Sequence, residues 1–504
     1  MDIVLDRTSR VPLYRQIAER FERLIAMGAL PDSFQLPPER GLAESLGVNR
    51  TTVLSAYREL KAAGLVGAHV GRGTAVLPRT SRRPAETGEV APVRWGQLFS
   101  RGVRRSQDPL LRDLLEVTER LDVISLSIGL PAPELLPLDT LARQIDALFR
   151  EVGASVLSHC PTEGHTPLRE SLCTWLATRG IHAHPAEVLV VSGSQQGLDL
   201  AARVFLDPGD LVVVEEPSYI GALQVFAGAQ ARVVGVPVDQ EGMRTDALAT
   251  VLERQRPKLI YTLPTFQNPS GAVLSLERRR MLLELAERSQ VPILEDDPYS
   301  ELRYDGEALP ALKALDRRGQ VLYLSTFSKV LFPGMRLGFV VAPGPVVRQL
   351  VLAKQVVDLH SNTLGQYLLD RFLREGHMEA HLRLLRAAYA RRRDAMREAL
   401  RPGLEAGLSW CEPAGGFYFW CRLPDGIEQS LLFSRAAERG VVYLPGRSCF
   451  CGDDGTRAFA RLNFSFPDEK TVAQGVGRFL DALREVSRRI RTPRPHTSGT
   501  PPVV

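Results

Sequence analysis

The sequence predicts an α/β protein in which a mostly parallel sheet, covered by helices on both faces, follows a small helical unit. Between about residues 120 and 487, short apolar runs alternate with helical segments, which is typical of a sheet buried on both sides. Ahead of this region, three helical apolar stripes precede a glycine-rich hairpin. A chain of 504 residues is too long for one core, so two or three domains are expected.

Composition shifts predict the domain boundaries. Between the two regions lies a stretch rich in proline and glycine with seven arginines from Arg82 to Arg112, which is typical of a linker. From Arg488 onward there are four arginines, four prolines and no acid, which favours disorder. The expected organisation is a helical domain, a linker, a large domain and a tail, at residues 1–78, 79–115, 116–487 and 488–504.

The overall composition excludes several classes of protein. An apolar content of 44% and a charged content of 24% are those of a soluble globular protein, and the net charge of +5 is mild. No apolar run approaches the roughly 18 residues of a membrane span, and the start lacks the pattern of a secretory signal. The six cysteines show neither metal-ligand spacing nor a disulfide framework. We therefore expect a cytoplasmic protein without a metal site.

The amino-terminal unit has the pattern of a helix-turn-helix with a wing. One apolar stripe forms the first helix: Leu13, Ile17, Phe21, Leu24 and Ile25. A second helix ends at Gly47, and Asn49 is expected to cap a third. The buried face of this third helix is predicted to be Val53, Ala56, Tyr57 and Leu60. Residues 65–76 then read as a hairpin about two glycines.

The stretch LPPERGLAESLGVNRTTVLSAYRELKAAGLV, followed by GRGTAV, resembles the winged-helix domain of the GntR regulator family. This resemblance implies binding to double-stranded DNA at an operator. It assigns a DNA-backbone contact to Arg40, the major groove to Arg50, Thr51 and Thr52, and the minor groove to Gly71 and Arg72. One departure is Asp32-Ser33, which stands where the family usually has Pro-Gly.

Lys329 is the most informative residue of the large domain. The chain has six lysines and 57 arginines, so its surface charge is normally carried by arginine. Lys329 follows the apolar run 321–324 and small hydroxyl residues. A primary amine can form a Schiff base with an aldehyde cofactor, which a guanidinium group cannot do.

Five further segments accompany Lys329. A Ser/Gly-rich turn at 192–197 joins a strand to a helix and suits an anion. Acids at 295–297 lie at the carboxyl end of an apolar strand, where open α/β sheets bind ligands and where a carboxylate can pair with a protonated ring nitrogen. Tyr219 and the turn 264–271 also follow strands, and Arg461 on an apolar strand suits a carboxylate.

In this order the segments resemble fold type I aminotransferases that use pyridoxal 5'-phosphate, a fold that also has a smaller C-terminal α+β subdomain. The resemblance implies that Lys329 forms the internal aldimine, that Asp296 pairs with the pyridine nitrogen and that Tyr219 stacks on the ring. It assigns the ring oxygen to Asn268 and Tyr299, the phosphate to Ser194, Gln195, Ser328 and Arg336, and a substrate carboxylate to Arg461. A departure is His159, which stands where the family commonly has a tyrosine that reaches the neighbouring subunit's phosphate.

A helix-turn-helix followed by an aminotransferase-like domain resembles the MocR subfamily of GntR regulators over nearly the whole chain. The implied function is a homodimeric transcription factor with pyridoxal phosphate or an amino compound as its effector. Two alternatives stay open at this point. One is a working aminotransferase with an accessory DNA-binding domain, and the other is a DNA-binding protein whose large domain is inert.

Overall fold

The computed structural model describes residue 5 and residues 11–26, 29–69, 73–77, 95–100, 102–103, 123–452 and 458–491. The chain forms two compact units, Met1–Arg104 and Arg105–Val504. Most of the predicted linker and tail lies outside the described residues. Within the described residues, no helix is both long enough and apolar enough to cross a membrane.

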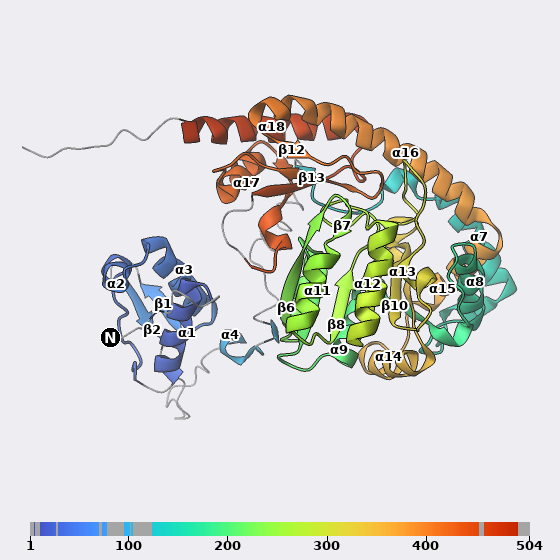
Figure 1. The fold of residues 1–504 in the computed structure, drawn as a ribbon, viewed down its shortest axis with the longest axis horizontal. Helices are drawn as coiled ribbons and strands as arrows, with labels where there is room; N and C mark the ends of the chain where they lie inside the picture. Colours follow the sequence, from blue (N-terminus) through green and yellow to red (C-terminus); the bar gives the residue numbers. More distant parts are fainter. Residues whose placement is uncertain are drawn as a thin grey trace, which may run out of the picture. The chain divides into compact units, whose positions relative to one another are not determined.

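The amino-terminal unit contains the three predicted helices and the hairpin (Figure 1). Helix α1 packs on α3, and α2 packs on α3 as well. The two strands are antiparallel, with Val66 opposite Val76. The elements are α1 (Leu13–Ala26), α2 (Glu39–Leu46), α3 (Arg50–Ala62), β1 (Val66–His69) and β2 (Gly73–Val76).

The predicted buried face of α3 is confirmed, because all four of its expected core residues are buried. Helix α2 ends at Gly47, whose φ of 61° lies in the left-handed region that favours glycine. Asn49 occupies the N-cap position of α3, but its side chain makes no capping bond, which corrects the expectation. The reason is local: the backbone amide of Thr52, which a cap would satisfy, donates to the carbonyl of Asn49 instead.

An eight-stranded sheet forms the centre of the large unit, in the order β4-β11-β10-β9-β8-β5-β6-β7. The five strands from β10 to β6 run parallel, whereas β11 and β7 are antiparallel to their neighbours. The prediction of a mostly parallel sheet is thus confirmed. Its strands are β4 (Val188–Val191), β5 (Leu211–Glu216), β6 (Arg232–Asp239), β7 (Gly242–Met243), β8 (Leu259–Thr262), β9 (Ile293–Asp297), β10 (Val321–Thr326) and β11 (Gly338–Val341).

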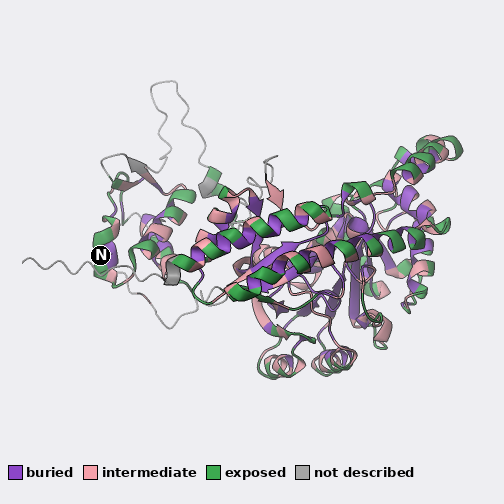
Figure 2. Cartoon of the chain, turned by 90° about the horizontal axis from the view of Figure 1, so that it is seen from above, coloured by how far each residue is buried: buried purple, intermediate pink, exposed green. Residues whose placement is uncertain are grey.

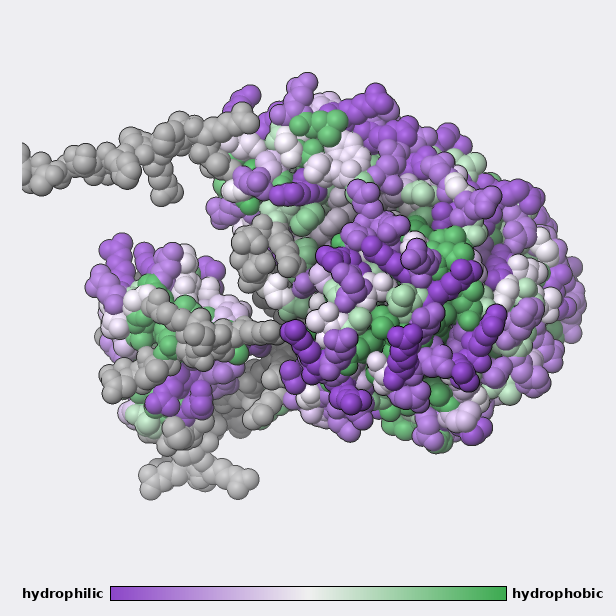
Figure 3. All heavy atoms as spheres, in the orientation of Figure 1, coloured by the Kyte–Doolittle hydropathy of each residue, from purple (hydrophilic) through white to green (hydrophobic). Residues whose placement is uncertain are grey.

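Helices cover the sheet, with α11 and α12 on the face seen in Figure 1. Buried residues concentrate in the strands, while the helices turn exposed residues outward (Figure 2). The face seen in Figure 3 is accordingly mostly hydrophilic over the large unit. Its helices up to residue 374 are α7 (Leu138–Glu151), α8 (Thr166–Ala177), α9 (Ser194–Phe205), α10 (Ile220–Gly228), α11 (Thr245–Arg254), α12 (Leu276–Ser289), α13 (Leu312–Leu315), α14 (Gly344–Val357) and α15 (Thr363–Arg374).

A smaller α+β subdomain follows, as predicted. Its antiparallel sheet has the order β12-β13-β16-β15, with strands Ser409–Trp410, Tyr418–Arg422, Phe459–Asn463 and Leu444–Pro445. Its helices are α16 (His377–Leu400), α17 (Gln429–Glu438) and α18 (Glu469–Arg491), and α16 packs on α18. A short parallel pair, β3 (Ile124–Ser125) with β14 (Val441–Val442), ties the start of this unit to the subdomain. The tail predicted from Arg488 therefore starts too early, because the buried apolar stripe of α18 runs to Val486 and its last turn extends to Arg491.

Candidate functional site

Asp296 lies near the carboxyl end of β9 and is 2% exposed. Its Oδ2 accepts a hydrogen bond of 2.9 Å from the Tyr261 hydroxyl on the neighbouring strand β8. Its Oδ1 is buried and has no hydrogen-bond partner among the described residues. Burial raises the pKa of Asp296 to about 7, although the Tyr261 hydrogen bond acts to lower it. The site thus contains a carboxylate oxygen without a donor.

Lys329 ends the one-turn helix η4 (Phe327–Lys329), which directly follows β10. Its Nζ donates to the carbonyl of Gly129 at 2.6 Å. Burial lowers the pKa of Lys329, and the charges of Arg461 and Arg336 act in the same direction. A lowered pKa keeps more of the amine neutral, which is the nucleophilic form.

Arg336 contacts the turn that precedes α9. The guanidinium donates to the Ser328 hydroxyl at 3.2 Å and to the Ser192 carbonyl at 3.4 Å. Gly193, with φ +83°, precedes Ser194 at the first position of the helix, and a Cβ on Gly193 would lie 2.6 Å from Arg336 Nη2. The first amides of a helix have no partner within it, so this turn and Arg336 form a cradle for an anion.

The ring of Tyr219 lies over a glycine. A Cβ on Gly221 would be 2.5 Å from the Tyr219 ring, so only glycine fits beneath it. The Tyr219 hydroxyl donates to Gln195 Oε1 at 3.1 Å, and the Gln195 amide donates to the Gly221 carbonyl at 3.2 Å. Burial raises the pKa of Tyr219 to about 12, which keeps the phenol neutral. The predicted stacking residue and one predicted phosphate residue are therefore held together.

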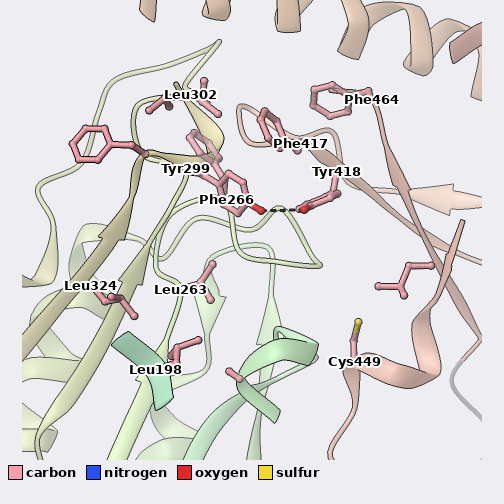
Figure 4. Close-up of a cluster of buried hydrophobic side chains, with 14 of the residues drawn as sticks. Leu198, Leu263, Phe266, Tyr299, Leu302, Leu324, Phe417, Tyr418, Cys449 and Phe464 are labelled. Carbon is pink, nitrogen blue, oxygen red and sulfur yellow. Dashed lines mark hydrogen bonds between the residues drawn. The ribbon is translucent and has the colours of Figure 1, made fainter. Parts of the chain in front are cut away.

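The guanidinium of Arg461 on β16 is largely hydrogen-bonded to other groups of the protein. It donates to Asn268 Oδ1 at 2.8 Å and to the Ser127 carbonyl at 2.7 Å, while Nε is buried and has no partner in the described part of the chain. The Tyr299 hydroxyl likewise shares a 3.0 Å hydrogen bond with the hydroxyl of Tyr418 (Figure 4). Asn268, Tyr299 and Arg461 thus lie together, each already engaged by a protein group.

Several residues of the site were not predicted. Tyr418 contacts Tyr299, and its ring lies 4.1 Å from the Arg461 guanidinium carbon. Gly129 and Tyr261 bind Lys329 and Asp296, respectively. The sequence contains signals for two of them: Gly415-Gly416 directly precedes an aromatic strand that contains Tyr418, and Tyr261 is a hydroxyl residue on an otherwise apolar strand. Gly129 had no such signal.

His159 pairs with another histidine. Its Nδ1 lies 3.1 Å from Nε2 of His360, and both line a pocket of about 280 Å³. The next residue, Ser361, approaches the cradle, with its Oγ 3.3 Å from the Ser192 Oγ.

The predicted DNA-contacting residues differ in their surroundings. Arg40 on α2 and Thr51 on α3 are exposed, whereas Thr52 is partly buried. Arg50 forms an ion pair of 3.1 Å with Glu39, so the fold brings an acid of α2 beside the start of α3. The remaining two, Gly71 and Arg72, lie outside the described residues.

The residues present fit pyridoxal phosphate. A buried carboxylate oxygen lacks a donor, an amine with a lowered pKa lies near it, and an anion cradle adjoins both. No group of three or more potential metal ligands occurs within the parts of the chain that the structure describes. The carboxylate, the amine and the cradle together suit an organic phosphate with a basic ring nitrogen.

Comparison with known proteins agrees with this geometry. Residues 122–479 match the aminotransferase class I and II family, and residues 13–76 match the gntR family of bacterial regulatory proteins. Aromatic-amino-acid aminotransferase 1 of Thermococcus litoralis is 38% identical over 81% of this chain and 99% of its own length. The probable rhizopine catabolism regulatory protein MocR of Rhizobium meliloti is 32% identical over 95% of this chain and 96% of its own.

A solved aminotransferase structure is similar to about four fifths of the chain. LysN, the α-aminoadipate aminotransferase of Thermus thermophilus, was solved with N-(5'-phosphopyridoxyl)-L-leucine. It is 38% identical, covers 79% of this chain and 100% of its own, and superposes with a TM-score of 0.73. These two aminotransferases thus cover about four fifths of the chain, whereas the regulator covers nearly all of it.

Proposed function

The chain belongs to the aminotransferase class I and II family and carries a GntR-family helix-turn-helix domain, as do the MocR regulators, and from this premise we propose how its site works. It is a DNA-binding transcriptional regulator fused to a domain of a pyridoxal phosphate-dependent family. In our proposal, Lys329 bonds the cofactor aldehyde and Asp296 holds its ring nitrogen. The phosphate lies against Ser194, Gln195, Ser328 and Arg336, and an amino compound that reaches this site alters DNA binding.

One observation carries this proposal: the unpartnered Oδ1 of buried Asp296. A buried carboxylate oxygen that accepts no hydrogen bond is destabilising unless a ligand supplies a donor. A protonated pyridine nitrogen supplies a donor and a positive charge in a single group. When bound, the cofactor would act as an electron sink, and this chain's residues would hold it and exclude water.

The experiment is a paired titration of full-length protein. Pyridoxal phosphate should give a visible absorption band, and borohydride reduction should fix the cofactor at position 329. The Lys329→Ala variant should show neither, whereas Lys258→Ala, at an exposed lysine of the same unit, should behave as wild type. A colourless wild-type protein at saturating cofactor would refute the proposal.

The effector is proposed to act by shifting a population. A small molecule changes DNA affinity only as far as its own affinity differs between the two arrangements of the protein. Candidate amino acids and amines are therefore to be screened in the loaded protein, with the cofactor spectrum and operator binding recorded together. An effector must change both signals at the same concentration. A compound that changes the spectrum alone is a ligand without a regulatory role.

A homodimer is proposed as the assembly. Exposed apolar side chains gather at the end of α14 and in the loop after it, including Leu352 at 56%, Val356 at 88% and Leu359 at 56% exposure. Exposed apolar clusters of this kind mark interfaces. A Val356→Asp substitution should raise the monomer fraction in sedimentation, whereas Leu404→Asp, at a leucine of 55% exposure on another element, should not.

A second candidate function is transamination. It is favoured by the lowered pKa of Lys329 beside Asp296 and by the unpartnered Nε of Arg461. Turnover of an amino acid and a keto acid at about 1 s⁻¹ or faster would assign the protein to the enzymes. A single half-reaction, together with effector-dependent DNA binding, would assign it to the regulators.

A further inference from the structure

Tyr418, the first residue of β13, lies where the groups of the candidate site converge. We propose that Tyr418 is a positioning residue that sets the proton affinity of the Lys329 nitrogen in the cofactor-loaded protein, by holding the hydroxyl of Tyr299. This inference rests on the proposed binding of pyridoxal phosphate at Lys329. It adds a residue that the sequence motifs do not mark.

Two glycines bring Tyr418 to this position. Gly416 has a φ of +70°, and a Cβ on Gly415 would lie 2.2 Å from the ring of Phe266. Only glycine lets the chain pass so close to the turn that also contains Asn268. The strand that follows therefore starts inside the site, and its first side chain points at Tyr299 (Figure 4).

The hydroxyl of Tyr418 is buried and also forms a hydrogen bond. Tyr418 is 4% exposed and Tyr299 is 1% exposed, and their oxygens lie 3.0 Å apart. One hydrogen bond joins two hydroxyls, so one of the two protons stays free for another acceptor. If Tyr418 donates, Tyr299 keeps its proton for the ring oxygen of the cofactor, and the bond that it receives strengthens its own donation.

The same side chain touches the other groups of the site. Its ring covers the Arg461 guanidinium at 4.1 Å, a cation–π contact. A Cβ on Gly129 would lie 1.9 Å from its hydroxyl oxygen, so the glycine that accepts the Lys329 hydrogen bond passes directly against Tyr418. Tyr418 also counters the lowering of the Lys329 pKa, of which burial is the main cause.

A side chain that only fills the core would not need the hydroxyl group of Tyr418. The neighbouring core positions Phe417, Phe419 and Phe464 are fully buried aromatic side chains without a hydroxyl. A buried hydroxyl is unfavourable unless it forms a hydrogen bond, and here the bond is made to a residue of the site. Packing and hydrogen bonding can therefore be separated by a Tyr418→Phe substitution.

The test is a pH titration of the visible absorption band in full-length, pyridoxal phosphate-loaded protein. A hydrogen bond donated to the ring oxygen competes with the Lys329 nitrogen's proton for the same lone pairs. Losing part of that donation in Tyr418→Phe should raise the pKa of this nitrogen by about half a pH unit. Tyr299→Phe should raise it further, and the double variant should match Tyr299→Phe alone.

The matched control is Tyr443→Phe, because the Tyr443 hydroxyl is buried in the same unit and has no hydrogen-bond partner among the residues that the structure describes, and this variant should leave the titration unchanged. An unchanged pKa in Tyr418→Phe overturns the inference while leaving cofactor binding intact. If Tyr418→Phe shifts the pKa of the Lys329 nitrogen equally in the wild-type and the Tyr299→Phe backgrounds, the effect does not pass through the Tyr299 hydroxyl, which overturns that route. If Tyr418→Phe does not fold, Tyr299→Phe breaks the same hydrogen bond from the other side, and an unchanged pKa there is equally decisive. Absence of the band in wild type instead refutes the proposed function.

Discussion

At the scale of single residues, burial prepares the side chains of this site before a ligand is present. Burial raises the pKa of three acids, Glu215, Glu295 and Asp296, to about 7 in each case. Glu215 accepts from Thr262 and Leu263, and Glu295 accepts from two backbone amides. Only Asp296 among these three keeps an unpartnered oxygen. The first two are structural, and the third is the one that can receive a ligand.

Replacing Asp296 with asparagine should stabilise the cofactor-free protein at high pH. The pKa of Asp296 is raised in the folded state from its ordinary 3.8, so its stabilising contribution is present at low pH and is lost as the pH rises through about 7. Asparagine does not ionise and can still accept from Tyr261. A shift of about three pKa units corresponds to about 4 kcal/mol, so the free energy of unfolding should exceed that of wild type by up to about 4 kcal/mol at pH 8 and by clearly less at pH 5.

Urea unfolding at the two pH values measures this difference. A gain of equal size at both would show that ionisation of Asp296 is not its cause. The same variant should bind pyridoxal phosphate more weakly, because a neutral amide holds a protonated ring nitrogen less strongly than a carboxylate does.

Arg50 should contribute to DNA binding more than to stability. Its ion pair with Glu39 is exposed, at 54% and 32%, and such pairs contribute about 0–1 kcal/mol. Arg50→Ala should therefore fold normally but bind an operator selected from random duplexes about 10–100-fold more weakly, since a base contact is worth about 1–3 kcal/mol. Lys61→Ala, on the last turn of the same helix, removes the same charge and should have the smaller effect in a mobility-shift assay. Equal losses of DNA affinity in the two variants would mean that Arg50 contributes only its positive charge.

At the scale of elements, the start of α9 is held from two sides. Arg336 contacts the turn before it, and Asp358 at the C-cap of α14 accepts from the Ser192 hydroxyl at 3.0 Å and from Gln196 Nε2 at 2.7 Å. Lys354 in turn pairs with Asp358 at 2.5 Å. The anion cradle is therefore a property of three elements that meet, not of the Ser/Gly-rich turn alone.

A Gly193→Ala substitution should weaken the cradle selectively. Its Cβ would lie 2.6 Å from the end of Arg336, a flexible side chain that must then move away. Cofactor affinity should fall at least about tenfold, as expected when one charge-assisted contact is lost. The control is Gly209→Ala, which has a similar φ of +96° and whose added Cβ would meet no atom of the described residues within 4 Å, so it shares the backbone strain only. Equal cofactor dissociation constants for the two variants would contradict this account.

At the scale of the whole molecule, two units with separate cores share one chain. Among the described residues, the amino-terminal core is built around Phe21, Val53 and Leu60 and is made of residues of that unit. Separate cores permit separate unfolding, since cooperativity follows shared packing. Regulation therefore requires that a ligand of one unit change the behaviour of the other.

Calorimetry of the full-length protein should resolve two transitions. Pyridoxal phosphate at 100 times its dissociation constant should stabilise the large unit by about 2.7 kcal/mol and raise only that transition, by a few degrees. The Lys329→Ala variant should show a smaller shift at the same concentration. A shift of both transitions together would mean that the two units unfold as one.

The sequence by itself determined the architecture. Periodicity predicted the core face of α3 and the buried strands of a mostly parallel sheet, because burial on one or both faces imposes a repeat that can be read locally. The site segments were likewise visible as strand ends and turns, since residues there are spaced by the strands themselves.

The tertiary structure alone decided which groups meet. Gly129 lies 200 positions from Lys329, and Tyr418 lies 119 positions from Tyr299, yet both pairs are hydrogen-bonded. The ion pair of Arg50 with Glu39 and the missing side-chain cap at Asn49 were also beyond local pattern. Hydrogen bonds and burial depend on distances that only the folded chain creates, so a local pattern can identify a candidate residue but not its partner.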